Sequence, residues 1–241
     1  MNDESAWVAG VDGCRAGWVV VWHPLDAKQS ARVAIFATFA DVLAMPEKPA
    51  VIAIDIPIGL PDITGPGGRS CDAAVRKFLG VRASSLFSVP SRSAVYSADY
   101  GAACTQASRT SDPPRKISKQ AFNLFPKMRE LDGLMTPDIQ GRVVECHPEF
   151  VFWRLNGSLA LEHSKKSSHG ARSRRDLLVR AGYPSAVFDR VSFRRKDACK
   201  DDVIDAFAAA SVACDILRGK ARRVPVCPEI DRKGLRMEIW G

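Results

Sequence analysis

The stretch WVAGVDGCRAGWVVVW, residues 7–22, decides how the fold begins. Two runs of apolar, β-branched and aromatic residues, 7–12 and 17–22, flank the short segment 13–16. Runs of this kind on either side of a short turn predict two antiparallel strands. The first predicted strand closes on Asp12, for which a turn-forming role is the alternative, because Asp-Gly is a common hairpin signal.

Three further segments extend the predicted sheet outward from this hairpin. RVAIF (32–36) predicts a third strand, and AVIAID (50–55) predicts a short buried strand that ends on Asp55. RVVEC (142–146) predicts a late strand that carries Glu145 near its end. Two of the three strands therefore bring an acid to a strand end.

Helices account for most of the remaining chain. Apolar spacing and terminal signals predict helices over 39–45, 69–79, 115–134, 172–181 and 200–219. Pro126 should bend or divide the third of them. The last, KDDVIDAFAAASVACDILRG, is apolar nearly all round and is expected to be buried. Together these elements predict an α/β fold, a mixed five-stranded sheet flanked by helices.

Length and composition limit the class of protein. The chain has 241 residues, of which 46% are hydrophobic and 26% charged, which excludes collagen-like, coiled-coil and disordered classes and favours a single domain over 1–241. No apolar run approaches the roughly 18 residues of a membrane span, and the first residues lack the pattern of a signal peptide. We therefore expect no membrane association and a cytoplasmic location. Seven scattered cysteines without zinc spacing fit such a compartment.

Positive charge is concentrated in one segment. The net charge is +8, and the interval 163–200 alone holds eleven Lys and Arg against three Asp. Such a concentration suits a polyphosphate, and nucleic acid is the natural partner. The alternative is an ordinary solvated face. Aromatic residues are sparse there, so the pattern does not favour base stacking.

The acids beside apolar segments are the candidate catalytic residues. They are Asp12, Asp55, Glu145, and the group Asp201, Asp202 and Asp205 at the start of the last helix. Buried carboxylates are costly unless they are paired or bind metal, and oxygen ligands without His or Cys favour Mg²⁺ or Mn²⁺. Two such ions roughly 4 Å apart would allow in-line phosphodiester hydrolysis. The alternatives are helix capping for Asp201 or Asp202, and a salt bridge or backbone hydrogen bond for Asp55 and Glu145.

Several basic side chains are candidate substrate-binding groups. Arginine suits phosphate because its planar fork makes bidentate contacts, although a surface salt bridge is the common alternative. His147 is a candidate general base or metal ligand, with a structural histidine as the alternative. The candidate arginines are Arg15, Arg69, Arg82 and Arg92 near the loops at the acidic end of the sheet, and Arg174 and Arg175 in the basic segment.

The chain resembles a widespread prokaryotic family of unknown function whose members are predicted to be RNase H-like nucleases. The resemblance runs in order from about residue 7 to residue 220. Its segments are GVDGCRAGWVVV (10–21), AIDIPIGLP (53–61), RSCDAAVRKFLG (69–80), SSLFSVPSR (84–92), QAFNLFPKMRELD (120–132), VECHPEFVF (144–152), RRDLLVRAG (174–182) and DDVIDAFAAA (201–210).

This resemblance implies an RNase H-like core with an acid on the first strand, another on the fourth strand and a further acid or pair on the final helix. Asp12, Asp55 and the pair Asp202 and Asp205 match those places, and DDVIDA resembles the DxxDA helix of RuvC-type Holliday-junction resolvases. Glu145 would be an additional ligand or base. The Pro- and Gly-rich loop 56–68 and a mainly helical insertion over about 82–140 depart from the minimal core.

Three functional hypotheses follow. The first is a divalent-metal-dependent nuclease in which the acids hold Mg²⁺ or Mn²⁺ and the basic segment holds backbone phosphates. The second is an actin-like phosphotransferase or ATPase, which the absence of a P-loop motif disfavours. The third is a non-catalytic nucleic-acid-binding or regulatory protein, because function need not follow fold. The oligomeric state stays open.

Overall fold

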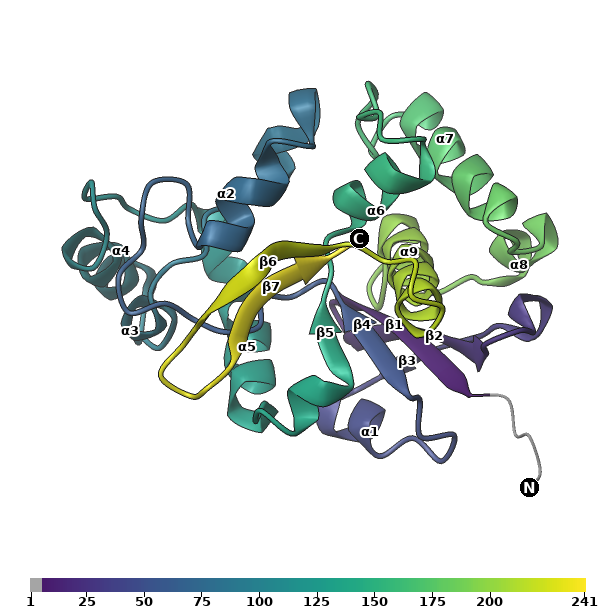
Figure 1. The fold of residues 1–241 in the computed structure, drawn as a ribbon, viewed down its shortest axis with the longest axis horizontal. Helices are drawn as coiled ribbons and strands as arrows, with labels where there is room; N and C mark the ends of the chain where they lie inside the picture. The colour runs from purple at the N-terminus through teal and green to yellow at the C-terminus, as the bar shows by residue number, and fades with distance from the viewer. Residues whose placement is uncertain (1–5) are drawn as a thin grey trace.

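A mixed sheet forms the centre of the molecule in the computed structural model, which describes residues 6–241 (Figure 1). Three antiparallel strands come first, and two strands parallel to the first follow along one edge, in the order β3-β2-β1-β4-β5. The mixed sheet predicted from the sequence is thereby confirmed. The strands are β1 (Trp7–Cys14), β2 (Gly17–Pro24), β3 (Arg32–Phe36), β4 (Val51–Ile54) and β5 (Val143–Glu145).

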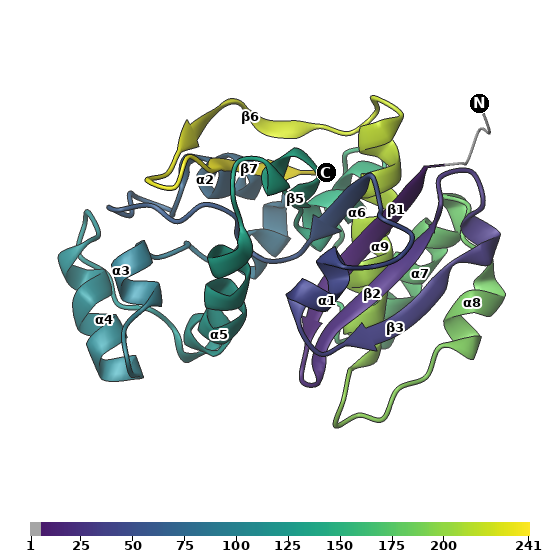
Figure 2. The same cartoon turned by 90° about the horizontal axis from the view of Figure 1, so that it is seen from below.

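Helices cover both faces of this sheet (Figures 1 and 2). Strand alternation produces the two faces, because Val8 and Val19 belong to one core and Ala9 and Val11 to the other. α1 (Phe39–Leu43) and α5 (Lys119–Leu134) lie on the face of Ala9. The opposite face is covered by α6 (Pro148–Leu155), α7 (Ser168–Arg180), α8 (Ser185–Arg190) and α9 (Lys200–Leu217).

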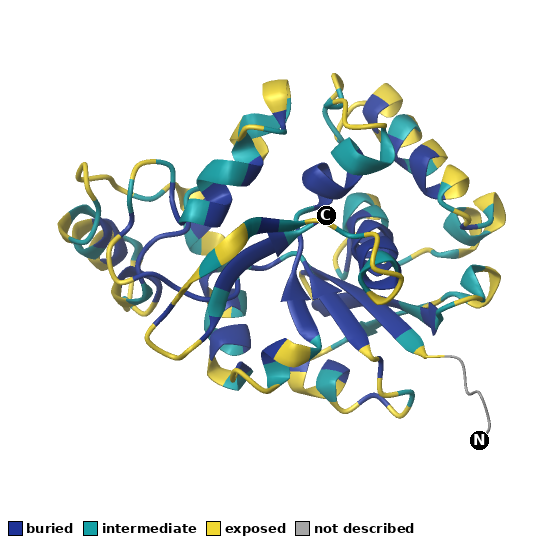
Figure 3. Ribbon diagram, viewed as in Figure 1, coloured by how far each residue is buried: buried dark blue, intermediate teal, exposed yellow. Residues whose placement is uncertain are grey.

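The closest helix-to-sheet contact is between α9 and β1. A Cβ atom on Gly10 would lie 2.0 Å from the backbone nitrogen of Ala210 and 2.2 Å from the carbonyl oxygen of Ala206. Glycine on the strand and alanine on the helix therefore let the two backbones approach each other. As Figure 3 shows, both elements are buried along most of their length. The helix predicted to be buried is confirmed as such.

The chain between β4 and β5 is mainly helical, as expected for the insertion. α5 begins at Lys119 rather than at residue 115 because the Ser118 side chain caps it by accepting from the Ala121 N–H. The helix runs on through Pro126 to Leu134, so the proline does not divide it. The other elements are α2 (Ser70–Arg76), η2 (Gly80–Ser85), α3 (Arg92–Val95), α4 (Tyr100–Arg109) and η3 (Ile139–Gly141), while η1 (Lys28–Ser30) precedes β3.

A C-terminal hairpin lies beyond the last element that the sequence predicted. β6 (Arg223–Ile230) pairs antiparallel with β7 (Arg236–Trp240), and both pack against α2 and Phe150. Pro225 and Pro228 interrupt the alternation that marks a strand, which hid β6 from the sequence analysis. In the part of the chain that the structure covers, no helix combines the length and the apolar character that crossing a membrane would require.

Candidate functional site

Two of the predicted acids lie side by side on neighbouring strands. Val11 on β1 is paired with Ile54 on β4, and the Asp55 N–H donates to the Val11 carbonyl at 3.1 Å. β1 continues two residues beyond Asp12, so this acid lies inside the strand and not at its end. Asp12 lies two residues after Gly10, and Asp55 lies two residues after Ala53. Residues two apart along a strand point to the same face, so both side chains are directed toward α9.

The close packing of α9 adds further carboxylates to this face. Asp205 precedes Ala206, lies one turn inside the helix and is 1% exposed. Lys165, in the loop before α7, donates to Asp205 Oδ2 at 2.5 Å. Asp202 is half-buried, and its Oδ2 accepts from the Cys199 N–H at 2.8 Å, so it also caps the helix. The N-cap residue is Cys199, so neither Asp201 nor Asp202 is the N-cap considered from the sequence; Asp202 lies three residues further on and completes the capping box, with its second oxygen still available.

Crowding of these carboxylates raises their pKa values. Burial, and then the charges of Asp55 and Asp205, raise the pKa of Asp12 well above its usual value. Burial and the charge of Asp205 raise the pKa of Asp55 to about 8. Burial also raises the pKa of Asp205, although the ammonium of Lys165 opposes the shift. A cluster in which carboxylates compete for protons is a cluster that a cation would stabilise.

Glu145 points to the other face of the sheet. Its neighbours Val144 and Cys146 pack with the α9 core, so alternation turns Glu145 toward the opposite side. Glu145 nevertheless lines the same cavity as Asp12 and Asp55, and its charge contributes to the raised pKa of Asp55. Its Oε1 lies 2.5 Å from Arg69 Nη2, and its Oε2 accepts from the Ile58 N–H at 2.7 Å. Burial raises the pKa of Glu145 to about 7 even though Arg69 opposes the shift. This geometry favours a structural role over the ligand or base that the resemblance implied.

Arg69 is fully engaged inside the protein. Its Nη2 contacts Asp72 at 2.7 Å as well as Glu145, and its Nη1 donates to the carbonyl oxygens of Ile58 and Gly59. Its Nε also faces Asp72, at 3.2 Å. With all its donors used, Arg69 organises the loop after β4, and the geometry does not favour the phosphate contact expected from the sequence.

The remaining candidate arginines are dispersed. Arg92 is half-buried and pairs with Asp132 and Asp231. Arg174 is buried and pairs with Glu149, again a structural position in place of the predicted substrate contact. The other three lie nearer solvent: Arg175 pairs with Asp189, Arg15 donates to the Arg195 carbonyl, and Arg82 is half-buried in η2.

The carboxylates open into a cavity of about 240 Å³. Asp12, Asp55, Asp202 and Lys165 line it together with His147. Burial lowers the pKa of His147 to about 4, so its ring is neutral at neutral pH and is a weak base. The Nδ1 atom of this ring is buried and has no hydrogen-bond partner among the described residues. The cavity thus joins charged oxygens and one neutral imidazole.

The donor set fits a hard divalent cation. Among residues 6–241, no Lys, Arg or His side chain forms a salt bridge with Asp12 or Asp55, so their carboxylate oxygens are available to a cation. Asp202 also keeps one oxygen available. At the start of α9, Cys199, Asp201 and Asp202 also place ligand atoms within 4.8 Å of one another. Carboxylate oxygens are the ligands that Mg²⁺ and Mn²⁺ prefer, and the binding of either ion stays a prediction.

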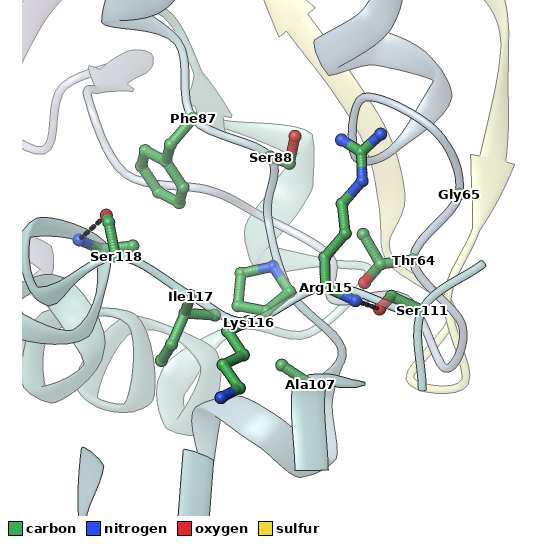
Figure 4. Close-up of a pocket in the computed structure, with 12 residues that line it drawn as sticks. Thr64, Gly65, Phe87, Ser88, Ala107, Ser111, Arg115, Lys116, Ile117 and Ser118 are labelled. Atoms are coloured by element: carbon green, nitrogen blue, oxygen red, sulfur yellow. Dashed lines mark hydrogen bonds between the residues drawn. The ribbon is translucent and has the colours of Figure 1, made fainter. Parts of the chain in front are cut away.

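A second cavity of about 250 Å³ lies beside the first, with Phe87 as a shared wall (Figure 4). Arg115 and Lys116 line it from the segment before α5, together with the hydroxyl-bearing Ser88 and Ser111. Neither cation forms an ion pair within residues 6–241. In Figure 4 the guanidinium of Arg115 extends toward Ser88 and Gly65. No sequence motif had distinguished these two residues.

Lys165 is the main site residue that the sequence analysis did not single out. It was counted in the basic segment with ten other Lys and Arg residues, and nothing local marks it as different. Its place beside Asp205 depends on how the loop between α6 and α7 crosses α9, a long-range property.

The raised pKa values predict that the metal-free protein loses stability with increasing pH. Asp55 titrates near 8 in the folded protein and near 3.8 when unfolded, so the folded state holds the extra proton between those values. The free energy of unfolding then falls as pH rises, by up to about 1.4 kcal/mol per pH unit. The lowered pKa of His147 has the opposite effect on stability below pH 6.5, the usual pKa of histidine. The effect of Asp55 is therefore best measured between pH 6.5 and pH 8.

Urea denaturation in EDTA at pH 6.5, 7 and 8 measures this slope. Asp55→Asn should flatten it, whereas Asp26→Asn, at an exposed position paired with Arg218, should not. A stability that is flat or rises across the window in the unsubstituted protein would contradict the assignment.

Comparison with known proteins gives one match. A family model described as "Protein of unknown function (DUF429)" matches residues 10–230. No curated protein and no solved structure is significantly similar to the chain.

Proposed function

The chain belongs to the DUF429 family of unknown function, and within it we propose that this protein is a divalent-metal-dependent nuclease with an RNase H-like core. One observation carries the proposal: Asp12 and Asp55 on adjacent strands line one cavity, and besides burial the charge of Asp205 on the last helix raises the pKa of both. First strand, fourth strand and final helix are the places that the sequence resemblance implied. Strongly perturbed carboxylates grouped at a cavity favour a functional site over a structural one.

Each residue of the site has a definable task in phosphodiester hydrolysis. Asp12 and Asp55 would hold the divalent ion, and Asp202 adds one oxygen from the start of α9. When bound, such an ion activates water and stabilises charge on the phosphoryl and leaving oxygens. The strand pairing between Val11 and Ile54 brings the residues that follow, Asp12 and Asp55, to adjacent positions, which favours their binding one ion together.

The charge distribution supports a polyanionic substrate. Eight basic residues of the 163–200 segment are exposed on and around α7 and α8, and they remain available although Arg174 is buried. The second cavity adds Arg115 and Lys116 on the other side of Phe87. A nucleic acid strand that crosses the acidic cavity would have basic groups on more than one side. The exposed residues are Lys166, Arg172, Arg180, Arg190, Arg194, Arg195, Lys196 and Lys200.

We expect the double substitution Arg115→Glu and Lys116→Glu to weaken oligonucleotide binding. Each lost phosphate contact should lower the slope of log affinity against log salt by about one. Fluorescence anisotropy with a labelled oligonucleotide in EDTA measures binding without cleavage. Arg109→Glu, at an exposed position outside both cavities, is the matched control. An unchanged salt slope in the double variant would remove this cavity from the interface.

A cleavage screen tests the proposed function directly. The purified full chain would be incubated with single-stranded, duplex, RNA–DNA hybrid and four-way-junction substrates in Mg²⁺, Mn²⁺ or EDTA. Cleavage that requires the divalent ion supports the proposal and ranks the substrates. Salt-sensitive binding without cleavage would replace the nuclease proposal with a binding role. If the protein shows no binding and no cleavage, the proposal is overturned.

A further inference from the structure

A lysine side chain lies inside the carboxylate cluster. Lys165 Nζ is 2.5 Å from Asp205 Oδ2 and 3.9 Å from Asp201 Oδ2, and Lys165 lines the cavity that Asp12 and Asp55 also line. Burial opposes its charge, but Asp205 outweighs burial, and the pKa of Lys165 is raised. The ammonium is therefore charged, and its charge acts on Asp12 and Asp55 as well.

The other buried cations near the cluster are already committed to different acids. Arg69 also lines the cavity but pairs with Glu145 and Asp72. Arg174 pairs with Glu149. Among residues 6–241, Lys165 is thus the cation that pairs with an acid of the site itself.

We propose that Lys165 takes the place of a second metal ion, so that the site binds one divalent ion, held by Asp12 and Asp55, while Asp205 is held by the lysine. This inference rests on the proposed metal-dependent function and specifies its cation content. It departs from the pair of ions that the sequence analysis predicted. Lys165 acts here as a positioning residue, because it fixes Asp205 and supplies a permanent positive charge.

The balance of charge supports a single ion. Glu145 also lines the cavity but is paired with Arg69. The remaining acids of the cluster, Asp12, Asp55, Asp202 and Asp205, carry four negative charges when ionised, and Lys165 with one divalent ion leaves them one net negative charge. A second divalent ion would make the site positive and would lie near an ammonium group that repels it. It would also compete with Lys165 for Asp205 Oδ2 and with the N–H of Cys199 for Asp202 Oδ2.

The number of bound ions is the measurement that tests this inference. Mn²⁺ is titrated into the full chain, and electron paramagnetic resonance of the free ion gives the stoichiometry. We expect one ion per chain in the unsubstituted protein and two in Lys165→Met, which keeps the length of the side chain but removes its charge. Lys166→Met, an exposed neighbour, is the matched control and should bind one ion.

A second pair of variants keeps the test valid if Lys165→Met fails to fold. Asp12→Asn should weaken Mn²⁺ binding by more than about tenfold, because Asp12 would be a ligand of the ion. Asp205→Asn should change Mn²⁺ binding by less than about threefold, because Asp205 pairs with Lys165 and not with the ion. Two ions in the unsubstituted protein, or equal losses in both Asn variants, would overturn the inference and leave the nuclease proposal standing. Absence of Mn²⁺ binding in every variant would overturn the proposed metal site itself.

Discussion

Asp12→Asn is expected to abolish metal-dependent cleavage while it stabilises the metal-free fold. Asparagine is nearly isosteric, and its carbonyl oxygen still accepts the Gly13 N–H that Asp12 Oδ1 accepts at 2.8 Å. It removes a charge that burial and two neighbouring carboxylates destabilise. A ligand to the ion is lost at the same time, which should lower the rate by at least about 10²-fold. Activity and stability thus move in opposite directions.

Two measurements on the same preparation separate this result from its alternatives. Cleavage in Mg²⁺ gives the rate, and thermal unfolding in EDTA at pH 8 gives the stability. Asp26→Asn, at an exposed position, controls for the change of charge and should alter neither. If Asp12→Asn cleaves normally, Asp12 is not a ligand. If it lowers the midpoint of unfolding, Asp12 is a structural turn residue, the alternative that its Asp-Gly sequence suggested.

The sequence predicted the sheet well because its determinants are local. The hairpin from residue 7 onward, the strand before Asp55 and the buried last helix each follow from apolar runs and their ends. Asp12, Asp55 and Asp205 come together because β4 ends opposite Val11, next to Asp12, and because Gly10 lets α9 approach β1 closely. Strand alternation and small residues are both readable in the sequence, so this part of the site could be predicted.

The remainder depends on long-range geometry. Glu145 belongs to a strand of three residues, and only the folded structure shows that it lines the acidic cavity while it pairs with Arg69. Arg69 pairs with the distant Glu145 as well as with nearby Asp72, and Arg174 pairs with Glu149 on another helix. Charge alone could therefore not distinguish a buried ion pair from a phosphate contact. Lys165 was hidden for the same reason, as one of many basic residues in its segment.

Arg69→Met is expected to destabilise the protein strongly, because it leaves two buried carboxylates without their cation. Asp72 and Glu145 are both almost fully buried, and Arg69 bridges them while it holds the carbonyl oxygens of Ile58 and Gly59. Removal of one partner from a buried ion pair typically costs about 3–5 kcal/mol. The loop after β4 would lose the hydrogen bonds that Arg69 donates to it, and the wall that this loop forms in the acidic cavity would be disturbed.

Urea denaturation of Arg69→Met, beside Arg232→Met, measures this loss. Arg232 pairs with Asp62 at the surface, where an exposed pair contributes at most about 1 kcal/mol. The double variant Arg69→Met with Glu145→Gln should recover part of the stability, since one unpaired charge is then removed. A phosphate-binding Arg69 would behave differently: the fold would keep its stability and only substrate affinity would fall. The two roles therefore predict opposite patterns, and the five donors that Arg69 directs into the protein favour the first.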